Sequence, residues 1–405
     1  MHELALCETL GAAARSHAEG RAGATLTRMP GSICDVLPSA AALLGAPGAD
    51  DRLALRDRIG KVDRVAVVLI DGMGWELLEA MTSCATSTTP LLTALLAGEV
   101  GHLSLLDSTF PSTTPTSLVS LGTGASPGEH GVLGFTLNIP GTDRVLNHIR
   151  WRDDPPHHEW QPLPTWFERL TQADVDARVV LPDGFAGSGL TDAAYRGARF
   201  RPVRHGDDWA RLLVDELRAG PGLVYGYTAE LDTAAHVFGI GSPQWHEAAA
   251  GIDSRLTHIV EGLPPSAALL VTADHGGLNV PPDARIDLDA EPRLSAGLRV
   301  VAGEPRVRHL HTKPGAAADV QANWAELLEG RAAVQSREQA VASGIFGPVD
   351  PSNLARIGDI VITCTADTAV LATAHEPPET ARLIGFHGAA TEAEMAIPLI
   401  AFTAG

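Results

Sequence analysis

The sequence predicts an α/β fold in which helices cover both faces of a mostly parallel central sheet, with a smaller lobe inserted before the last strand. Two observations support this prediction. Short apolar runs, typical of strands buried on both faces, alternate along the chain with longer segments of helical periodicity. Several of these runs end in aspartate, glycine or histidine, which are residues expected where a strand turns into a helix.

Four apolar runs are the predicted core strands. They cover residues 65–70, 222–227, 267–273 and 397–402. Helices are expected at 163–172, 206–219 and 243–262. The last of these places four large apolar residues on one face, at positions Trp245, Ile252, Leu256 and Ile259.

Three segments do not follow this alternation. Residues 1–60 are rich in alanine and leucine but broken by proline and glycine, and we expect a helical lead-in packed on the core. Residues 135–162, which hold Trp151 and Trp160, are expected to form a lid. Residues 279–384 contain short strands and helices and are expected to form the inserted lobe, which leaves 61–278 and 385–405 for the core.

Length and composition restrict the possible functions. At 405 residues the chain is large enough for one α/β domain with an added lobe. A formal net charge of −19 disfavours nucleic acid polymers and anionic lipid as partners. No apolar run approaches the ~20 residues of a membrane helix, and the first residues lack the pattern of a secretory signal. Four scattered cysteines fit a reducing compartment, so we expect a cytoplasmic protein with no membrane partner.

A stretch rich in hydroxyl groups leads into a short predicted helix. It runs from Asp107 to Pro115 and is followed by apolar residues up to Gly122. Proline favours the first helical position, so Thr114 is expected at the N-cap, among unpaired backbone N–H groups. Such a helix end binds anions, and a hydroxyl held there beside a divalent cation is a candidate nucleophile. The plainer alternative is a threonine that only caps its helix.

Four polar clusters lie at the ends of predicted core strands. Because the carboxyl ends of parallel strands face one crevice, we expect these side chains to converge. Taken singly, each has an ordinary explanation as a strand-to-helix turn, a solvated helical pair or a surface histidine. Together they form an oxygen and nitrogen ligand set suited to zinc and acceptable to manganese. The residues are Asp71, Asp232 with His236, Asp274 with His275, and His387.

At these residues the sequence resembles the alkaline phosphatase superfamily, and within it the nucleotide pyrophosphatase/phosphodiesterase branch. The segment Phe-Pro-Ser-Thr-Thr at 110–114 matches the aromatic-Pro-x-x-Thr motif of that branch, and Thr-Gly at 123–124 and His-Gly at 130–131 match its next two motifs. Its Asp-x-x-x-His, Asp-His-Gly and final His-Gly motifs correspond to 232–236, 274–276 and 387–388. The resemblance covers about residues 65–135, 221–280 and 384–402.

The resemblance implies a site with two divalent metal ions, with zinc as the first candidate and manganese as the second. It implies that Thr114 attacks phosphorus and forms a covalent phospho-enzyme or nucleotidyl-enzyme intermediate, which water then hydrolyses. The expected substrate is a small phosphodiester or pyrophosphate, with nucleotides among the candidates. One metal ion is expected on Asp71, Thr114, Asp274 and His275, and the other on Asp232, His236 and His387.

Two positions depart from the pattern of the branch. Pro115 follows Thr114 where the branch has an aromatic residue that can stack on a nucleobase, and the phosphate-contacting asparagine of the branch aligns near Phe135. Other residues are therefore candidate substrate contacts, with a solvated basic loop as the plainer alternative. Three other functions stay open: a phosphonate hydrolase, a phosphomonoesterase with the same metals, and a structural metalloprotein or binding module. The candidate contacts are Asn138, His309, His311 and Lys313.

Overall fold

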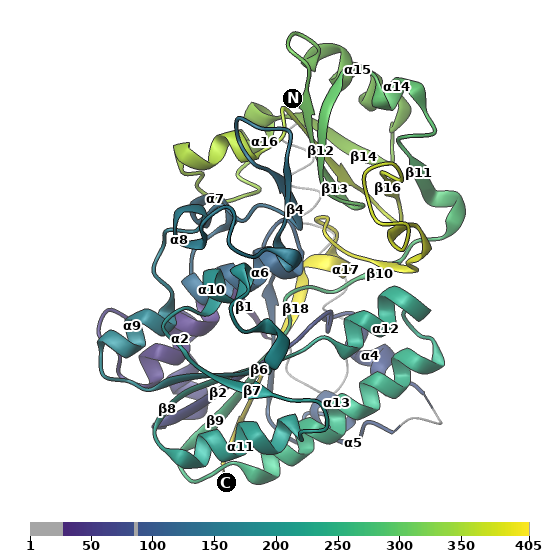
Figure 1. The fold of residues 1–405 in the computed structure, drawn as a ribbon. Helices are drawn as coiled ribbons and strands as arrows, with labels where there is room; N and C mark the ends of the chain where they lie inside the picture. The colour runs from purple at the N-terminus through teal and green to yellow at the C-terminus, as the bar shows by residue number, and fades with distance from the viewer. Residues whose placement is uncertain (1–26, 85–87, 405) are drawn as a thin grey trace.

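An eight-stranded sheet runs through the centre of the protein in a computed structural model that describes residues 27–84 and 88–404 (Figure 1). One strand, β18, pairs antiparallel with both of its neighbours, and every other pairing in this sheet is parallel. The predicted α/β class with a mostly parallel sheet is therefore confirmed. The strand order is β1 (Thr27–Ser32), β3 (His102–Asp107), β18 (Ala396–Thr403), β9 (Ala267–Thr272), β2 (Arg64–Ile70), β8 (Gly222–Thr228), β6 (Ala177–Pro182) and β7 (Arg199–Val203).

The four strands predicted from the sequence are the four central strands of this sheet, β18, β9, β2 and β8. They are almost completely buried, which explains their continuous apolar runs. The strands that the sequence did not reveal form the two outer pairs. In β3 and β7 exposed or half-buried positions interrupt the apolar ones, so neither strand contains a long apolar run.

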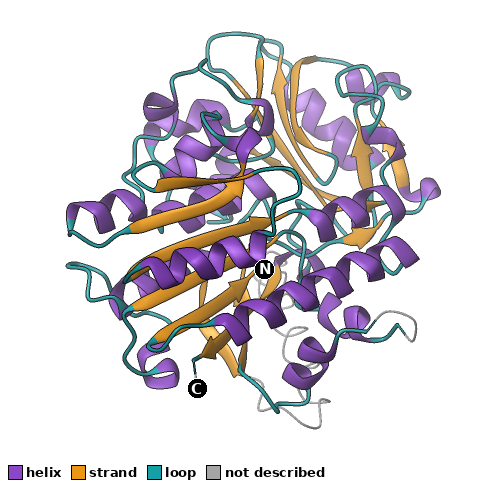
Figure 2. Ribbon diagram, turned by 60° about the horizontal axis from the view of Figure 1, so that its bottom comes forward, coloured by secondary structure: helices purple, strands orange, loops and turns teal. Residues whose placement is uncertain are grey.

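Helices cover both faces of the sheet (Figure 2). Two adjacent residues of β8 show this, because neighbouring strand residues point to opposite faces. Gly226 faces α11 (Trp209–Ala219), where a Cβ atom added to the glycine would lie 2.6 Å from Leu213. Tyr225 faces α9 (Trp166–Gln172), with its ring 6.2 Å from that of Phe167. The predicted helix at 243–262 is α13 (Pro243–Gly262), beside α11.

The amino-terminal region differs in part from the expected helical lead-in. Helices α2 (Val36–Leu43) and α3 (Leu55–Ile59) are present, but β1 forms an edge strand of the main sheet, parallel to β3. Pro30 and Gly31 fall within this strand, and such residues are tolerated at a sheet edge. The expectation for residues 1–26 lies outside the described residues.

A second sheet lies within 279–384, the range proposed for the inserted lobe. It is antiparallel and stands apart from the main sheet in Figure 1. One of its faces packs on α15 (Ala317–Leu327) through Trp324, whereas Val307 and Val361 join the main core. The lobe is thus continuous with the core. Its strand order is β12 (Leu298–Glu304), β13 (Val307–Thr312), β15 (Ile360–Cys364) and β14 (Ala332–Ser336).

The segment at 135–162, expected to form a lid, connects the core with this lobe. Strands β4 (Thr136–Asn138) and β5 (Val145–Asn147) form a hairpin, and the Thr136 hydroxyl donates a hydrogen bond to the Gly303 carbonyl at 2.8 Å. Trp151 and Trp160 belong to this segment, and both are buried.

Among the helices that the structure describes, none has the length and apolar character that crossing a membrane requires.

Candidate metal centre

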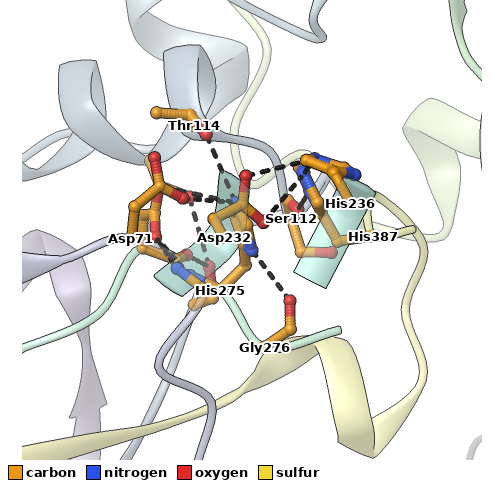
Figure 3. A network of polar contacts seen from close by, with 12 residues as sticks. Asp71, Ser112, Thr114, Asp232, His236, His275, Gly276 and His387 are labelled. Carbon is orange, nitrogen blue, oxygen red and sulfur yellow. Dashed lines mark hydrogen bonds and ion pairs between the residues drawn. The ribbon is translucent and has the colours of Figure 1, made fainter. Parts of the chain in front are cut away.

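The seven residues proposed as metal ligands meet at the carboxyl-terminal edge of the central strands, and Figure 3 labels six of them, all except Asp274. Each comes from the chain segment that follows or precedes a sheet strand, because parallel strands bring their carboxyl ends together. Asp71 follows β2, the Asp274-His275 pair follows β9, and α12 (Glu230–Phe238) follows β8. Two donors complete the set: Thr114, which begins α6 (Thr114–Thr123), and His387, which follows β17 (Gly385–Phe386).

Four donor atoms form a first group around one point. His275 Nε2 lies 3.3 Å from Thr114 Oγ1, 3.3 Å from Asp71 Oδ1 and 3.4 Å from Asp274 Oδ2. Both of these carboxylate oxygens are buried and have no hydrogen-bond partner in the described part of the chain. Ligand atoms about 2.0–2.1 Å from one zinc ion are about 3.3–3.4 Å apart in a tetrahedral site. The three distances from His275 Nε2 are in this range.

A second group lies beside the first. Asp232 Oδ2 is 3.1 Å from His236 Nε2, which is 3.2 Å from His387 Nε2, and His387 Nε2 is 4.0 Å from Asp232 Oδ1. Asp232 also lies within 4.8 Å of ligand atoms of Asp71 and His275. This carboxylate is therefore shared by the two candidate ligand groups.

The three histidines share one hydrogen-bonding pattern. In each, Nδ1 donates to a backbone carbonyl: His236 to Gly385 at 2.8 Å, His275 to Gly276 at 2.8 Å, and His387 to Ser112 at 2.9 Å. A carbonyl oxygen only accepts, so Nδ1 carries a proton in each ring, and Nε2 is the nitrogen that faces the donor groups. Such an outer hydrogen bond is the usual partner of a metal-bound histidine.

The site has more negative charge than its own residues neutralise. Burial raises the pKa of Asp71 well above its usual range, and Asp274 and Asp232 raise it further. Burial also raises the pKa of Asp274, to about 6. Burial alone would lower the pKa of His236, but the Asp232 carboxylate raises it to about 9. Within residues 27–84 and 88–404, no lysine or arginine forms an ion pair with these carboxylates, so a cation bound here would offset their repulsion.

Gly72 allows two of the carboxylates to approach the end of β2. Its φ of +72° is a left-handed conformation, and a Cβ atom on it would lie 3.0 Å from the Asp232 side chain. The Gly72 N–H also donates to Asp274 Oδ1 at 3.1 Å. A larger residue at position 72 would separate the loops that position the ligands.

Thr114 lies one position further into its helix than expected. The N-cap of α6 is Thr113, in an extended conformation, and Thr114 is the first helical residue. A one-residue difference at a helix end is common, and the hydroxyl remains at the end where N–H groups are unpaired. Thr114 is 8% exposed, so its hydroxyl is largely shielded from solvent.

One neighbour of the ligands was not predicted from the sequence. The Tyr227 hydroxyl donates a short hydrogen bond to Asp71 Oδ2 and so leaves Oδ1 to face the first group. Tyr227 lies near the end of β8, directly beside β2 in parallel register. Its position at the end of a predicted core strand was a usable signal, because Asp71 directly follows the neighbouring strand.

A cavity of about 590 Å³ opens over the second group and includes His236 and His387 in its lining. The β4–β5 hairpin forms one wall, and β12 with the loop at 372–383 forms the others. The lid segment and the inserted lobe thus surround the space beside the ligands. Glu304, another residue that sequence analysis missed, also lines the cavity, and no motif around it marked it in the sequence.

Asn138, a predicted substrate contact, stabilises the β4–β5 hairpin instead of facing the cavity. Its side-chain amide donates to the carbonyls of Thr142 at 2.9 Å and Arg144 at 3.0 Å. The residue is buried and is not part of the cavity lining. Its hydrogen bonds hold the hairpin turn in place.

The other three predicted contacts also lie outside the cavity lining. His309 is buried, with Nε2 donating to Leu133 O at 3.0 Å and Nδ1 accepting from Gly358 N–H at 3.2 Å. His311 is buried on the same strand, and Lys313 is exposed beyond its end. These residues connect or flank the lobe and do not reach the proposed substrate space.

Comparison with protein families gives an independent result. Residues 65–390 match the model of the family described as type I phosphodiesterase / nucleotide pyrophosphatase. The chain belongs to this family. The branch predicted from the sequence motifs is therefore confirmed, and the matched range includes all seven residues of the two groups.

Solved structures of similar fold include two groups of enzymes. Murine ectonucleotide pyrophosphatase / phosphodiesterase 5, in an inactive form in complex with AMP, gives a TM-score of 0.67 at 18% identity, covering 84% of this chain and 87% of that one. Phosphonoacetate hydrolase from Sinorhizobium meliloti 1021, in complex with phosphonoformate, gives 0.61 at 21% identity, covering 83% and 89%. At these identities the likeness shows a shared fold.

A curated relative matches over a shorter range. Alkaline phosphatase PhoD from Zymomonas mobilis is 29% identical over 112 residues, which is 24% of this chain and 19% of the relative. The match thus spans about a fifth of that protein.

Proposed function

We propose that this chain is a two-metal-dependent hydrolase of phosphodiesters or pyrophosphates and that Thr114 is its nucleophile. One observation carries the proposal: two buried carboxylate oxygens without hydrogen-bond partners and a threonine hydroxyl all lie 3.3–3.4 Å from one histidine nitrogen. Membership of the phosphodiesterase family supports the same chemistry. The cytoplasmic location expected from the composition stays a prediction.

The residues fit two divalent cations, with zinc as the first candidate because the donors are nitrogen and oxygen atoms at tetrahedral spacing. The first group would hold one cation and the second group the other. Bound there, the cations would supply Lewis acid chemistry, favouring the ionised threonine and offsetting charge on the phosphoryl and leaving oxygens. The ligands of the first group are Asp71, Thr114, Asp274 and His275, and those of the second are Asp232, His236 and His387.

The protein's own residues determine how the substrate is attacked. Thr114 Oγ1 forms a bond to phosphorus while the bond to the leaving oxygen breaks, and water later hydrolyses the phosphothreonine. The start of α6 provides the positive end of the helix dipole for the phosphoryl oxygens. Pro115 has no N–H, so the amide of Thr116 is the next donor along this helix end. The cavity over His236 and His387 receives the leaving group.

Replacement of the nucleophile tests this proposal. We expect Thr114→Ala to lower kcat/KM for bis(4-nitrophenyl) phosphate, with zinc or manganese added, by at least about 1,000-fold. Thr123→Ala is a matched control, because Thr123 is a buried threonine at the other end of the same helix. A folded Thr114→Ala protein that keeps the wild-type rate would refute the nucleophile.

A phosphonate hydrolase is the second candidate, because the chain also shares its fold with phosphonoacetate hydrolase. With cations held beside it, the same threonine would be suited to phosphonates and to phosphomonoesters. Rates measured side by side on a diester, a monoester and phosphonoacetate distinguish these activities. Inactivity on all three, together with no bound metal after gentle purification, would instead favour a binding protein.

A further inference from the structure

A buried carboxyl group from the inserted lobe faces the cavity beside the second group. Glu304 is the last residue of β12, and its side chain is 5% exposed. Its Oε1 makes no hydrogen bond to any residue that the structure describes. The same cavity is lined by His236 and His387. A buried carboxyl group in a residue that lines a cavity, with one oxygen lacking a hydrogen bond, is suited to contact a bound ligand.

This carboxyl group lies beside Thr113, which precedes the proposed nucleophile, and beside the loop of His387. A Cβ atom added to Gly388 would lie 2.8 Å from Glu304 Cδ and 3.1 Å from its Oε2, so only glycine leaves room for the carboxyl group here. The Thr113 hydroxyl, next to the proposed nucleophile, is also a neighbour of the carboxyl group. The Ser112 N–H donates to Gly388 O at 3.0 Å and joins the two segments.

A buried ion pair fixes the turn that carries Glu304. Arg306, two residues further on, is completely buried and donates from Nε to Glu394 Oε1 at 2.9 Å and from Nη2 to Oε2 at 2.7 Å. Glu394 Oε1 also accepts from the Ala389 N–H at 2.9 Å, two residues beyond His387. The turn of the lobe and the loop of His387 are thus attached to the same carboxylate. This arrangement fixes the backbone from which the Glu304 side chain extends.

The surroundings favour the protonated form of Glu304. Burial raises its pKa to about 8, although the Thr113 hydroxyl and the Arg308 guanidinium lower it. Arg308 is not available as a close partner, because its guanidinium forms an ion pair with Glu376 and donates to the Val370 carbonyl. A protonated carboxyl group in the leaving-group cavity is a hydrogen-bond donor.

We propose that Glu304 is the general acid that protonates the leaving-group oxygen, and that the substrates are phosphodiesters of poorly leaving alcohols such as alkyl alcohols. This inference rests on the proposed function. The cavity that receives the leaving group contains Glu304, and a pyrophosphate or nitrophenolate leaving group is stable as an anion and needs no such proton. An alkoxide leaving group does need one.

In this step each bond that forms is matched by one that breaks. Thr114, whose proton has passed to solvent, forms the Oγ1–P bond, and the electron pair of the breaking P–O bond goes to the leaving oxygen. That oxygen takes the proton of Glu304 and departs as an alcohol. Water then attacks the phosphothreonine and gives a proton to the Glu304 carboxylate, which restores the acid. The released threonine oxygen is again the nucleophile.

A leaving-group comparison tests the proposal. The full-length, metal-loaded protein is assayed on methyl 4-nitrophenyl phosphate and on methyl phenyl phosphate, which share the transferred group but differ in leaving ability. We expect Glu304→Gln to lower kcat/KM for the phenyl ester about 100-fold or more and to change that for the nitrophenyl ester only a few-fold. Glu304→Asp, which keeps a carboxyl group, should recover part of the loss on the phenyl ester.

His375→Gln is the matched control. His375 lines the same cavity, but its Nε2 lies 3.4 Å from Asp289 Oδ1 and has no contact with Arg308, so any loss should be equal for the two esters. The melting temperature and zinc content of each variant show whether fold and metal site are intact. Equal losses on both esters, or no loss on either, in a folded Glu304→Gln protein would overturn this inference alone. No hydrolysis of either ester by the wild type would overturn the proposed function as well.

Discussion

Two sets of three histidines in this protein use their ring nitrogens differently. In the metal-centre set, His236, His275 and His387, Nδ1 donates to a backbone carbonyl and Nε2 reaches only other potential ligand atoms. In the packing set both nitrogens have ordinary partners. These are Ser120 and Val132 for His130, Phe135 and Trp160 for His148, and Leu133 and Gly358 for His309.

This difference shows that the second ring nitrogen distinguishes a candidate ligand from a histidine that packs. His130 and His387 are both followed by glycine, and both are buried. The glycine that follows each histidine therefore does not distinguish the candidate ligand His387 from the packing residue His130. The partner of Nε2 does, because His130 Nε2 is 2.8 Å from the Ser120 hydroxyl whereas His387 Nε2 is 3.2 Å from His236 Nε2.

The largest expected effect follows from removing one histidine of each set. We expect His387→Ala to weaken zinc binding by more than the 10- to 100-fold typical of losing an outer hydrogen bond, because a ligand itself is removed. His309→Ala should leave zinc affinity unchanged and lower only the stability, since it loses buried hydrogen bonds. Titration calorimetry and zinc content after dialysis provide the measurement. Equal zinc affinities in the two variants would abolish the distinction between the sets.

The centre of the fold and the convergence of the candidate ligands could be predicted from the sequence for one physical reason. Strands buried on both faces need continuous apolar runs, and their carboxyl ends meet at one edge. The polar residues directly after 65–70 and 267–273 therefore had to lie close together. The same reasoning places α12 there, with Asp232 and His236 one turn apart.

The outer strands and the cavity residues could not be predicted in this way. Strand β7 is an edge strand with exposed arginines and Pro202, so it has no apolar run. Glu304 reaches the site because β12 and β13 form a hairpin whose turn is attached to Glu394, a contact between residues 88 positions apart. His309 was selected from a basic-looking segment, but its strand is buried and its ring is fully hydrogen-bonded.

A smaller effect should come from the hydrogen bond to Asp71. Burial raises the pKa of Tyr227 well above its usual range, so its hydroxyl stays protonated and donates to Asp71. We expect Tyr227→Phe to weaken zinc binding by roughly 10- to 100-fold, because the carboxylate loses the contact that orients it. Tyr225→Phe is the control on the same strand, since the Tyr225 hydroxyl contacts Tyr195 rather than a ligand. Equal zinc affinity in the Tyr227→Phe protein and the wild type would show that Asp71 needs no such support.

The smallest expected effect is a pH dependence of stability due to the packing set. Burial lowers the pKa of His309 to about 3 from the ordinary 6.5. Between these values the unfolded chain binds a proton that the folded protein excludes, so the free energy of unfolding falls as pH decreases below about 6.5. Each pH unit there costs about 1.4 kcal/mol for a single such group. In urea unfolding at pH 7 and pH 5.5, His309→Gln should therefore lose less stability than the wild type, by about 1 kcal/mol. An equal loss in both proteins would mean that His309 takes up a proton in the folded state. A ring protonated on both nitrogens can still donate to Leu133 O, but it can no longer accept from the Gly358 N–H.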